Sequence, residues 1–168
     1  IYYVGFGAEE DSKEAIKWYR RSAEQGNIES QNQLGRLFSL GSGVGKDPSE
    51  SVKWYRLAAN QGSTEAQYAL GMAYKFGDGV ERDAKKAVRW LRLAANKGSA
   101  GSQHSLGLSY KYGNGVDKDL KEAIRWLNLA AGQGLPAAQF SLGIAYTNGE
   151  GVKKSAKEAK LSKFVNNI

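Results

Sequence analysis

The amino-acid sequence repeats itself every 36 residues, and this strict period limits the fold more than any other feature. The tryptophans mark it, because each lies 36 positions after the one before: Trp18, Trp54, Trp90 and Trp126. Glutamine, leucine and aromatic columns keep the same register: Gln31, Gln67, Gln103 and Gln139; Leu34, Leu70, Leu106 and Leu142; Phe38, Tyr74, Tyr110 and Tyr146. Self-similarity at a fixed period of this length indicates a repeat architecture.

Each repeat is predicted to begin with an amphipathic helix, as over residues 65–76. Ala66, Leu70 and Tyr74 lie on one apolar stripe at helical spacing. Gly77 follows, and glycine adopts the left-handed backbone conformation that ends a helix without steric cost. The first helix of this repeat is therefore expected to stop at residue 76.

A loop and a second helix complete each repeat. Val80 is expected to pack as an apolar side chain between the two helices. Asp83 is expected to cap the N-terminus of the helix over 84–96. Residues 5–11 match the same loop, which makes 12–25 the second helix of an incomplete first repeat. The position three residues after the cap favours glutamate, as in a capping box: Glu14, Glu50, Glu122 and Glu158, with Lys86 as the exception. One helix pair cannot bury its apolar face alone, so the copies are predicted to stack into an all-α solenoid.

The loop at 41–47, GSGVGKD, resembles a phosphate-binding P-loop in its glycines and its Gly-Lys pair. Its Gly45-Lys46 pair does not recur in the other copies, and the P-loop pattern requires glycine at Leu40 and serine or threonine at Asp47. A P-loop also follows a strand, whereas the preceding segment is predicted to be helical. The glycines of this loop are therefore assigned to helix ends and turns, and no cofactor is expected.

The repeat from Ala66 to Gly98 resembles the Sel1-like repeat (SLR), a relative of the tetratricopeptide repeat. The resemblance is carried by Leu70-Gly71, Gly77-x-Gly79-Val80, Asp83, Trp90 and Ala94-Ala95. The resemblance covers essentially the whole chain. It implies an α/α right-handed superhelical solenoid that serves as an interaction scaffold. Some secreted bacterial members carry one disulfide per repeat and have been claimed as hydrolases; this chain has no cysteine and departs from that subgroup.

The repeats are expected to form a single solenoid over residues 1–168. It would comprise a partial repeat at 1–27, repeats at 28–63, 64–99 and 100–135, and a variant terminal repeat at 136–168 with Ser162 in the tryptophan column. Both ends depart from the pattern, so the chain is interpreted as part of a longer array. The helix at 12–25 would then leave an apolar end exposed, which leaves end-to-end self-association open.

The variable positions of the first helices are the candidates for recognition, because the regular columns serve the scaffold. In related solenoids the first helix lines the concave surface, where variable aromatic and basic side chains suit a peptide or protein segment. The candidate partner-binding residues are Asn32, Arg36, Tyr68, Lys75, His104, Lys111, Phe140 and Thr147. The alternative is that the columns of Tyr68 and Met72 pack between neighbouring repeats, as aromatic stripes at helical spacing usually do.

The second helices carry a basic face that is expected on the convex side, and the formal net charge is +7. Its members are Lys13, Lys17, Arg20, Lys53, Arg56, Lys85, Arg89, Arg92, Lys121 and Arg125. The alternative function is therefore binding of nucleic acid, an anionic membrane or an acidic partner. A solvated helix face explains the same charges, because the capping glutamates offset some of them and no aromatic residues are interleaved to stack bases.

The sequence predicts no enzyme and no metal site. His104 is the lone histidine and its column holds Asn, Tyr and Phe elsewhere, so no general acid or base is maintained. No nucleophile and base can be paired, and no carboxylates fall at a metal-ligand spacing. No apolar run approaches the roughly 20 residues of a membrane span. The absence of cysteine favours the cytoplasm and leaves the periplasm and secretion open.

Overall fold

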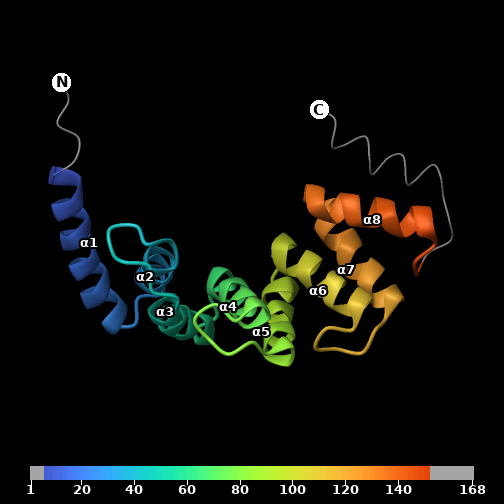
Figure 1. Ribbon diagram of the computed structural model, residues 1–168, viewed down its shortest axis with the longest axis horizontal. Helices are drawn as coiled ribbons and strands as arrows, with labels where there is room; N and C mark the ends of the chain where they lie inside the picture. The colour runs from blue at the N-terminus through green and yellow to red at the C-terminus, as the bar shows by residue number, and fades with distance from the viewer. Residues whose placement is uncertain (1–5, 152–168) are drawn as a thin grey trace, which may run out of the picture. The chain divides into compact units, whose positions relative to one another are not determined.

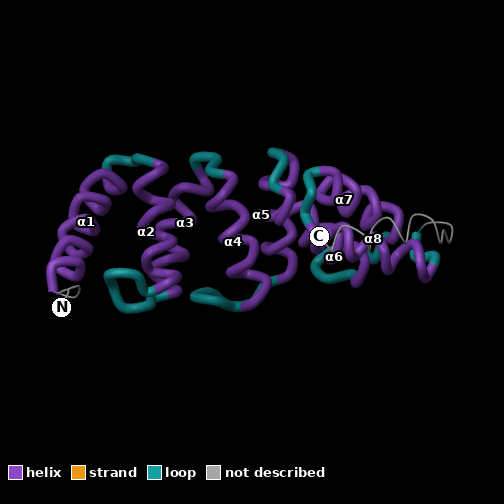
Figure 2. The backbone as a smooth tube through the Cα atoms, turned by 90° about the horizontal axis from the view of Figure 1, so that it is seen from above, coloured by secondary structure: helices purple, strands orange, loops and turns teal. Residues whose placement is uncertain are grey.

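The computed structural model describes residues 6–151, with side chains from residue 13 onwards. This part of the chain forms eight α-helices and no strand, which confirms the all-α prediction (Figures 1 and 2). The variant terminal helix predicted after residue 151 lies outside the described residues. The helices are α1 (Phe6–Glu24), α2 (Ile28–Leu40), α3 (Pro48–Asn60), α4 (Thr64–Phe76), α5 (Ala84–Asn96), α6 (Ala100–Tyr112), α7 (Leu120–Gly132) and α8 (Pro136–Asn148).

The chain divides into two compact units, Ile1–Arg82 and Asp83–Ile168, called here the first and the second unit. In the first unit α2 packs against α1 and α3, and α4 packs against α3. In the second unit α6 packs against α5 and α7, and α8 packs against α7. The expectation of one continuous solenoid over the whole chain stays a prediction.

The prediction of a loop over residues 5–11 is wrong, because α1 begins at Phe6 and runs without interruption to Glu24. The other copies have valine in this loop, and Val44 and Val116 are anchored in apolar clusters. The first copy has Ala8 at the equivalent position and continues with strong helix formers. Without the valine anchor, local helix propensity prevails and joins this segment to the second helix.

The other loops follow the predicted helix-end chemistry at their glycines and aspartate caps. The predicted capping box is wrong, because the backbone N–H of Asp47 and that of Asp119 donate to the carbonyls of Phe38 and Tyr110 rather than to a glutamate side chain. Gly77 has φ +79°, and its backbone N–H donates to the carbonyl of Ala73 as α4 ends. The carboxylate of Asp83 then accepts a hydrogen bond from the backbone N–H of Lys86 at 2.9 Å and caps α5. That bond holds the pKa of Asp83 below its usual value. Asp47 and Asp119 cap α3 and α7 in the same way.

The second glycine of the loop has a role beyond its backbone angle. Gly115 has φ +76°, and a Cβ at this position would clash with the backbone carbonyl of Ala84. A Cβ at Gly79 would likewise clash with the backbone carbonyl of Pro48, and a Cβ at Gly151 with that of Leu120. At these three glycines the backbone therefore packs onto the start of the second helix of the preceding repeat. Only a residue without a side chain fits there.

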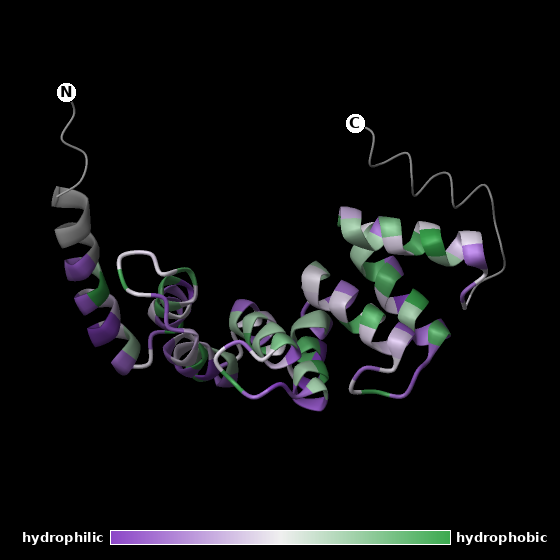
Figure 3. Ribbon diagram, viewed as in Figure 1, coloured by the Kyte–Doolittle hydropathy of each residue, from purple (hydrophilic) through white to green (hydrophobic). Residues whose placement is uncertain are grey.

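The apolar residues of each helix face its neighbours, while hydrophilic residues occupy the other faces (Figure 3). In the first unit Trp54 is buried in a cluster with Ile16 and Ala23 of α1 and Leu34 and Phe38 of α2. The tryptophan of one repeat thus packs on the repeat before it. Trp126 occupies the equivalent place in the second unit, with Val88, Ala95 and Leu106.

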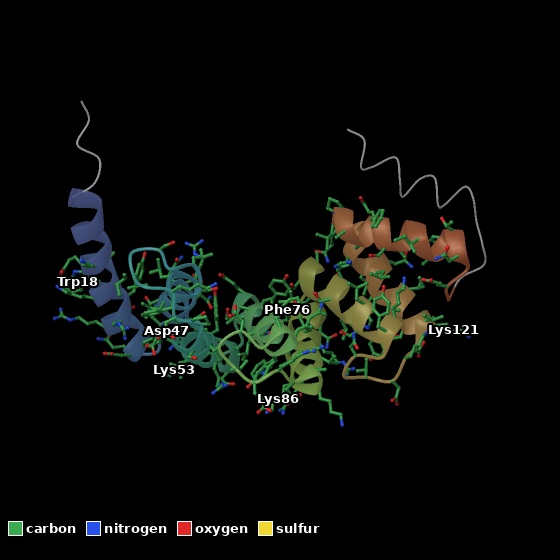
Figure 4. The ribbon with its side chains drawn as sticks, viewed as in Figure 1. Trp18, Asp47, Lys53, Phe76, Lys86 and Lys121 are labelled. Atoms are coloured by element: carbon green, nitrogen blue, oxygen red, sulfur yellow. The ribbon has the colours of Figure 1, made fainter. Side chains whose placement is uncertain are left out.

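Trp18 is the exception to the structural role expected for the tryptophan column, because 59% of its surface is exposed. Among the described residues no repeat precedes α1 to cover it. Its side chain lies on the side of α1 away from α2 (Figure 4), and the guanidinium of Arg21 stands 4.9 Å from its ring centroid.

The invariant glutamines tie each first helix to the helix before it. Gln31 donates from Nε2 to the carbonyl of Ala23, and Gln103 to that of Ala95, at 3.0 and 3.1 Å. The Oε1 atom of Gln103 accepts a further bond from Gln133 at 2.7 Å. Buried amides with this many partners fix the register between helices.

Candidate functional site

The first unit contains a groove of about 760 Å³ along α4, between that helix and the α2–α3 pair. Because α4 directs Ala66 and Leu70 into the core, its opposite side is left to line the groove. We call it the α4 groove, and its main lining residues are Ser39, Val52, Tyr55, Glu65, Tyr68, Met72, Phe76 and Asp78. Phe76 projects from the last turn of α4 with 66% of its surface exposed (Figure 4).

Tyr55 is one of the polar residues that line the α4 groove. Its ring lies so close to Gly35 that a Cβ on that glycine would stand 2.7 Å from Tyr55 Cδ1. Burial, with a smaller effect of the Glu65 charge, raises the pKa of Tyr55 to about 12, while the positive charge of Arg36 acts in the opposite direction. The Tyr55 hydroxyl is protonated at neutral pH, as a tyrosine ordinarily is, and can donate a hydrogen bond.

The predicted partner-binding residues of the first unit have different surroundings. Tyr68 is half-buried and lines the α4 groove, whereas Arg36 is exposed and donates to Gln33 Oε1 at 2.8 Å. Lys75 is half-buried with Nζ 5.4 Å from the ring centroid of Phe76, and burial lowers its pKa. Asn32 is buried, and its Oδ1 accepts a hydrogen bond from Ser63 Oγ at 3.0 Å.

In the second unit the predicted residues are largely engaged with the protein itself. His104 Nε2 lies 3.1 Å from Ser141 Oγ, and Thr147 Oγ1 donates to the carbonyl of Gly143. Lys111 has only 14% of its side chain exposed and forms an ion pair with Glu150 at 2.7 Å. The hydrogen bond from Lys111 lowers the pKa of Glu150. Phe140 is 52% exposed.

Sequence reasoning missed several residues that line the α4 groove, chiefly Tyr55, Glu65 and Phe76. Tyr55 lies on a second helix, in a column that holds Tyr19, Leu91 and Leu127 in the other copies. A variable aromatic in that column was the available signal. The predicted site comprised first-helix positions only, whereas this groove is also lined by a second helix.

The acidic residues of the second helices pair mainly with their own lysines and arginines. Glu14 pairs with Lys17, Glu50 with Lys53 and Glu122 with Arg125, at 2.9, 3.0 and 2.8 Å. Within residues 13–151 no three His, Asp or Glu side chains gather as a metal ion would require. None of the described helices is long and apolar enough to cross a bilayer.

Solved structures share this arrangement of helices. A protective antigen of uropathogenic Escherichia coli with an SLR fold is 38% identical, with a TM-score of 0.86 over 89% of this chain. A Sel1 repeat protein of Oxalobacter formigenes is 34% identical, with a TM-score of 0.86 over 90% of this chain. This chain spans 32% and 60% of the lengths of those two proteins. Cysteine-rich protein B of Helicobacter pylori shares the fold, with a TM-score of 0.60. It is 24% identical, and the match covers 77% of this chain and 93% of that protein.

The Sel1 repeat model matches residues 1–27, 28–63, 64–99, 100–135 and 136–160, and the internal boundaries agree with the 36-residue period. A comparison with curated proteins gave no match. Sel1 repeat proteins generally act as protein-interaction scaffolds and are typically non-catalytic. Because the repeat model covers nearly the whole chain and two solved relatives are more than 30% identical over most of it, this protein belongs to the Sel1 repeat family.

Proposed function

We propose that this protein is a non-catalytic scaffold whose α4 groove binds a peptide segment of a partner protein. The observation that supports the site is the groove itself: a hollow of about 760 Å³ on the side of α4 that the core does not use. Tyr68 and Met72, on two of the variable columns, line it. Clefts of this size with apolar walls and few polar groups are the usual form of binding sites.

The lining defines what the bound segment should offer. Val52, Met72 and Phe76 provide apolar contact for one or two large side chains, and the Tyr55 hydroxyl can donate to a peptide carbonyl. From residue 65 to residue 76 the helix rises about 16 Å, which matches about five residues of extended peptide. The groove therefore suits a short extended segment with an apolar or aromatic anchor.

The remaining candidate residues contribute unequally to this proposal. Arg36 and Lys75 stay as contacts near the groove, while the exposed Phe140, with His104 and Thr147, would form a separate contact surface in the second unit. Asn32 and Lys111 are not proposed as contacts. The first is buried against Ser63, and the second is paired with Glu150.

A selection experiment tests the site. Peptides selected from a random displayed library on the full chain would be synthesised with a fluorophore, and their affinities measured by fluorescence anisotropy. Phe76→Ala and Tyr68→Ala should each weaken binding by about tenfold or more, because buried aromatic anchors dominate interface energies. Tyr112→Ala is the matched control: Tyr112 occupies the column of Phe76 on α6 and is 61% exposed, but it does not line the α4 groove.

The outcomes separate the site from the function. Selected peptides that bind both groove variants as tightly as the wild-type chain would refute the α4 groove as the site. Failure to select any peptide from libraries of extended and helical segments would refute peptide binding itself. Circular dichroism of each variant checks that helicity is unchanged.

A further inference from the structure

The helix α5 differs from the other second helices at one capping position. On those helices a glutamate three residues after the cap position pairs with the cation that follows it on the next turn: Glu14 with Lys17, Glu50 with Lys53 and Glu122 with Arg125. On α5 the equivalent residue is Lys86 (Figure 4), so Arg89 has no carboxylate three residues before it. One change in an otherwise regular column both adds a positive charge and removes the partner of another.

As a result α5 carries Lys85, Lys86, Arg89 and Arg92 and no acidic residue. Lys86 forms an ion pair with the capping carboxylate of Asp83 at 3.3 Å. Arg92 donates from Nη2 to the hydroxyl of Tyr110 at 2.7 Å. Lys85 and Arg89 have no carboxylate partner in the described part of the chain. Their charge is therefore available to a partner outside the protein.

These cations surround a hollow in the second unit. A pocket of about 380 Å³ lies between α5 and the loop after α6 and is lined by Lys85, Arg89 and Arg92 together with Val88, Leu93 and Val116. Leu93 is 42% exposed, so it offers apolar contact beside the charges. The cations follow one another at i, i+4 and i+7, which places them along about 10 Å of the helix axis.

We propose that this α5 pocket binds an acidic peptide segment that carries an apolar side chain among its carboxylates. The cations match the carboxylates, and Val88, Leu93 and Val116 match the apolar side chain. An extended peptide places the side chains of residues i and i+2 on one face about 7 Å apart, so two carboxylates fit within the span of the cations.

The surroundings of the pocket disfavour other anionic partners. Single-stranded nucleic acid binds by stacking its bases on exposed aromatic rings. The Arg92 guanidinium lies over the Tyr110 ring beside this pocket, 5.9 Å from the ring centroid, where a base would have to stack. The adjoining hollow contains Asp117 and Asp119, which would be repelled by an anionic bilayer. A peptide can place its carboxylates on the cations alone and avoid these acids.

The α5 pocket shares no residue with the α4 groove, so the two proposals can fail separately. The test uses the full chain and two labelled probe peptides in fluorescence anisotropy. One probe has a central leucine flanked by Asp and Glu, and the other has the same leucine flanked by Asn and Gln. The acidic probe should bind, its affinity should fall with added salt, and the neutral probe should bind at least about tenfold more weakly.

The decisive variant is Lys86→Glu with Arg89→Gln, which rebuilds the glutamate of the other repeats and lowers the net charge by three. It should weaken binding of the acidic probe by about tenfold or more. The matched control, Lys121→Glu with Arg125→Gln on α7, lowers the net charge by the same amount and should change the affinity by less than about twofold. Leu93→Ser should weaken binding by about threefold or more through the lost apolar contact.

Several outcomes would overturn the proposal. Equal losses in the α5 and α7 variants would mean that the acidic probe responds only to the overall charge. Equal binding of the neutral probe would exclude charge recognition. Tighter binding of single-stranded RNA or phosphatidylserine vesicles, lost in the α5 variant, would assign the pocket to another class of partner. Thermal melts followed by circular dichroism should show the α5 variant at least as stable as wild type, because a glutamate in the first turn of a helix interacts favourably with the helix dipole.

Discussion

Arg92 on α5 donates a hydrogen bond from Nη2 to the hydroxyl of Tyr110 on α6, at 2.7 Å, across two helices that pack together in the second unit. Arg56 and Tyr74 form the same contact between α3 and α4 at 3.1 Å. Phe38 occupies the same aromatic column but has no hydroxyl, and the guanidinium of Arg20 lies 5.2 Å from its ring centroid. Arg20 also forms an ion pair with Glu50 at 3.5 Å. An arginine on one helix and an aromatic on the next thus join successive repeats.

Tyr110→Phe should lower the free energy of unfolding by about 0.5–1.5 kcal/mol, the usual net value of a hydrogen bond, because only the hydroxyl is lost. Tyr146→Phe is the matched control, since Asn128 stands in the arginine column opposite it and the change should cost less. Urea denaturation of both variants measures the difference. Equal costs at the two positions would contradict a stabilising role for the arginine–tyrosine contact.

Gly115→Ala should destabilise the protein by about 1–3 kcal/mol for the left-handed backbone alone, and by more because of the clash with the carbonyl of Ala84. Gly45→Ala is the control, because a Cβ there meets nothing within 4 Å and φ is not in the left-handed region. That change should be neutral or stabilising, since it restricts the unfolded chain. Thermal melts compare the two. A tolerated Gly115→Ala would refute the close approach of loop and helix.

Gln103→Leu should cost about 1–3 kcal/mol, because it removes the bond to the Ala95 carbonyl and the one accepted from Gln133. Gln139→Leu removes a single, longer bond of 3.4 Å to the carbonyl of Ala131, and the Oε1 atom of Gln139 is buried without a partner. The second change should therefore cost less. Chemical denaturation gives both values, and the reverse order would contradict the role assigned to this column.

Acidification should weaken the Lys111–Glu150 pair. The pKa of Glu150 is lower in the folded protein than its ordinary value, chiefly through the hydrogen bond from Lys111, so the ionised carboxylate stabilises the fold. This contribution to the free energy of unfolding is complete above the ordinary pKa of glutamate. It is lost as the pH falls through the lowered pKa of Glu150 in the folded protein. The stability difference between wild type and Glu150→Gln should be present at pH 7 and vanish in acid. Glu81→Gln, at an exposed position, should show no such trend.

The 36-residue period predicted most of the fold, because the columns of the core and of the helix ends meet similar surroundings in the full repeats. The helix over 84–96 and its buried face at Ala87, Val88 and Leu91 match α5. The period failed where those surroundings are missing. Residues 6–11 lack the valine anchor and become helical, and within the described part of the chain Trp18 has no preceding repeat of the kind on which Trp54 and Trp126 pack.

The candidate site was harder to predict, because a groove depends on which side chains are absent as much as on those present. Asn32 and Tyr68 share a column, yet the first is buried under Ser63 and the second lines the α4 groove. The pattern also could not show that Tyr55, from a second helix, reaches the same hollow. Such placements depend on the packing of several helices rather than on the periodicity of one.

The most direct test of the central claim is a two-dimensional amide NMR titration of the full chain with a peptide selected on it. Binding in the α4 groove predicts that the shift changes concentrate at residues that line it, among them Tyr55, Tyr68, Met72 and Phe76. The same titration with Phe76→Ala should require a peptide concentration about tenfold higher. Shift changes concentrated elsewhere, or an unaltered titration of the variant, would contradict the assignment of partner binding to the α4 groove.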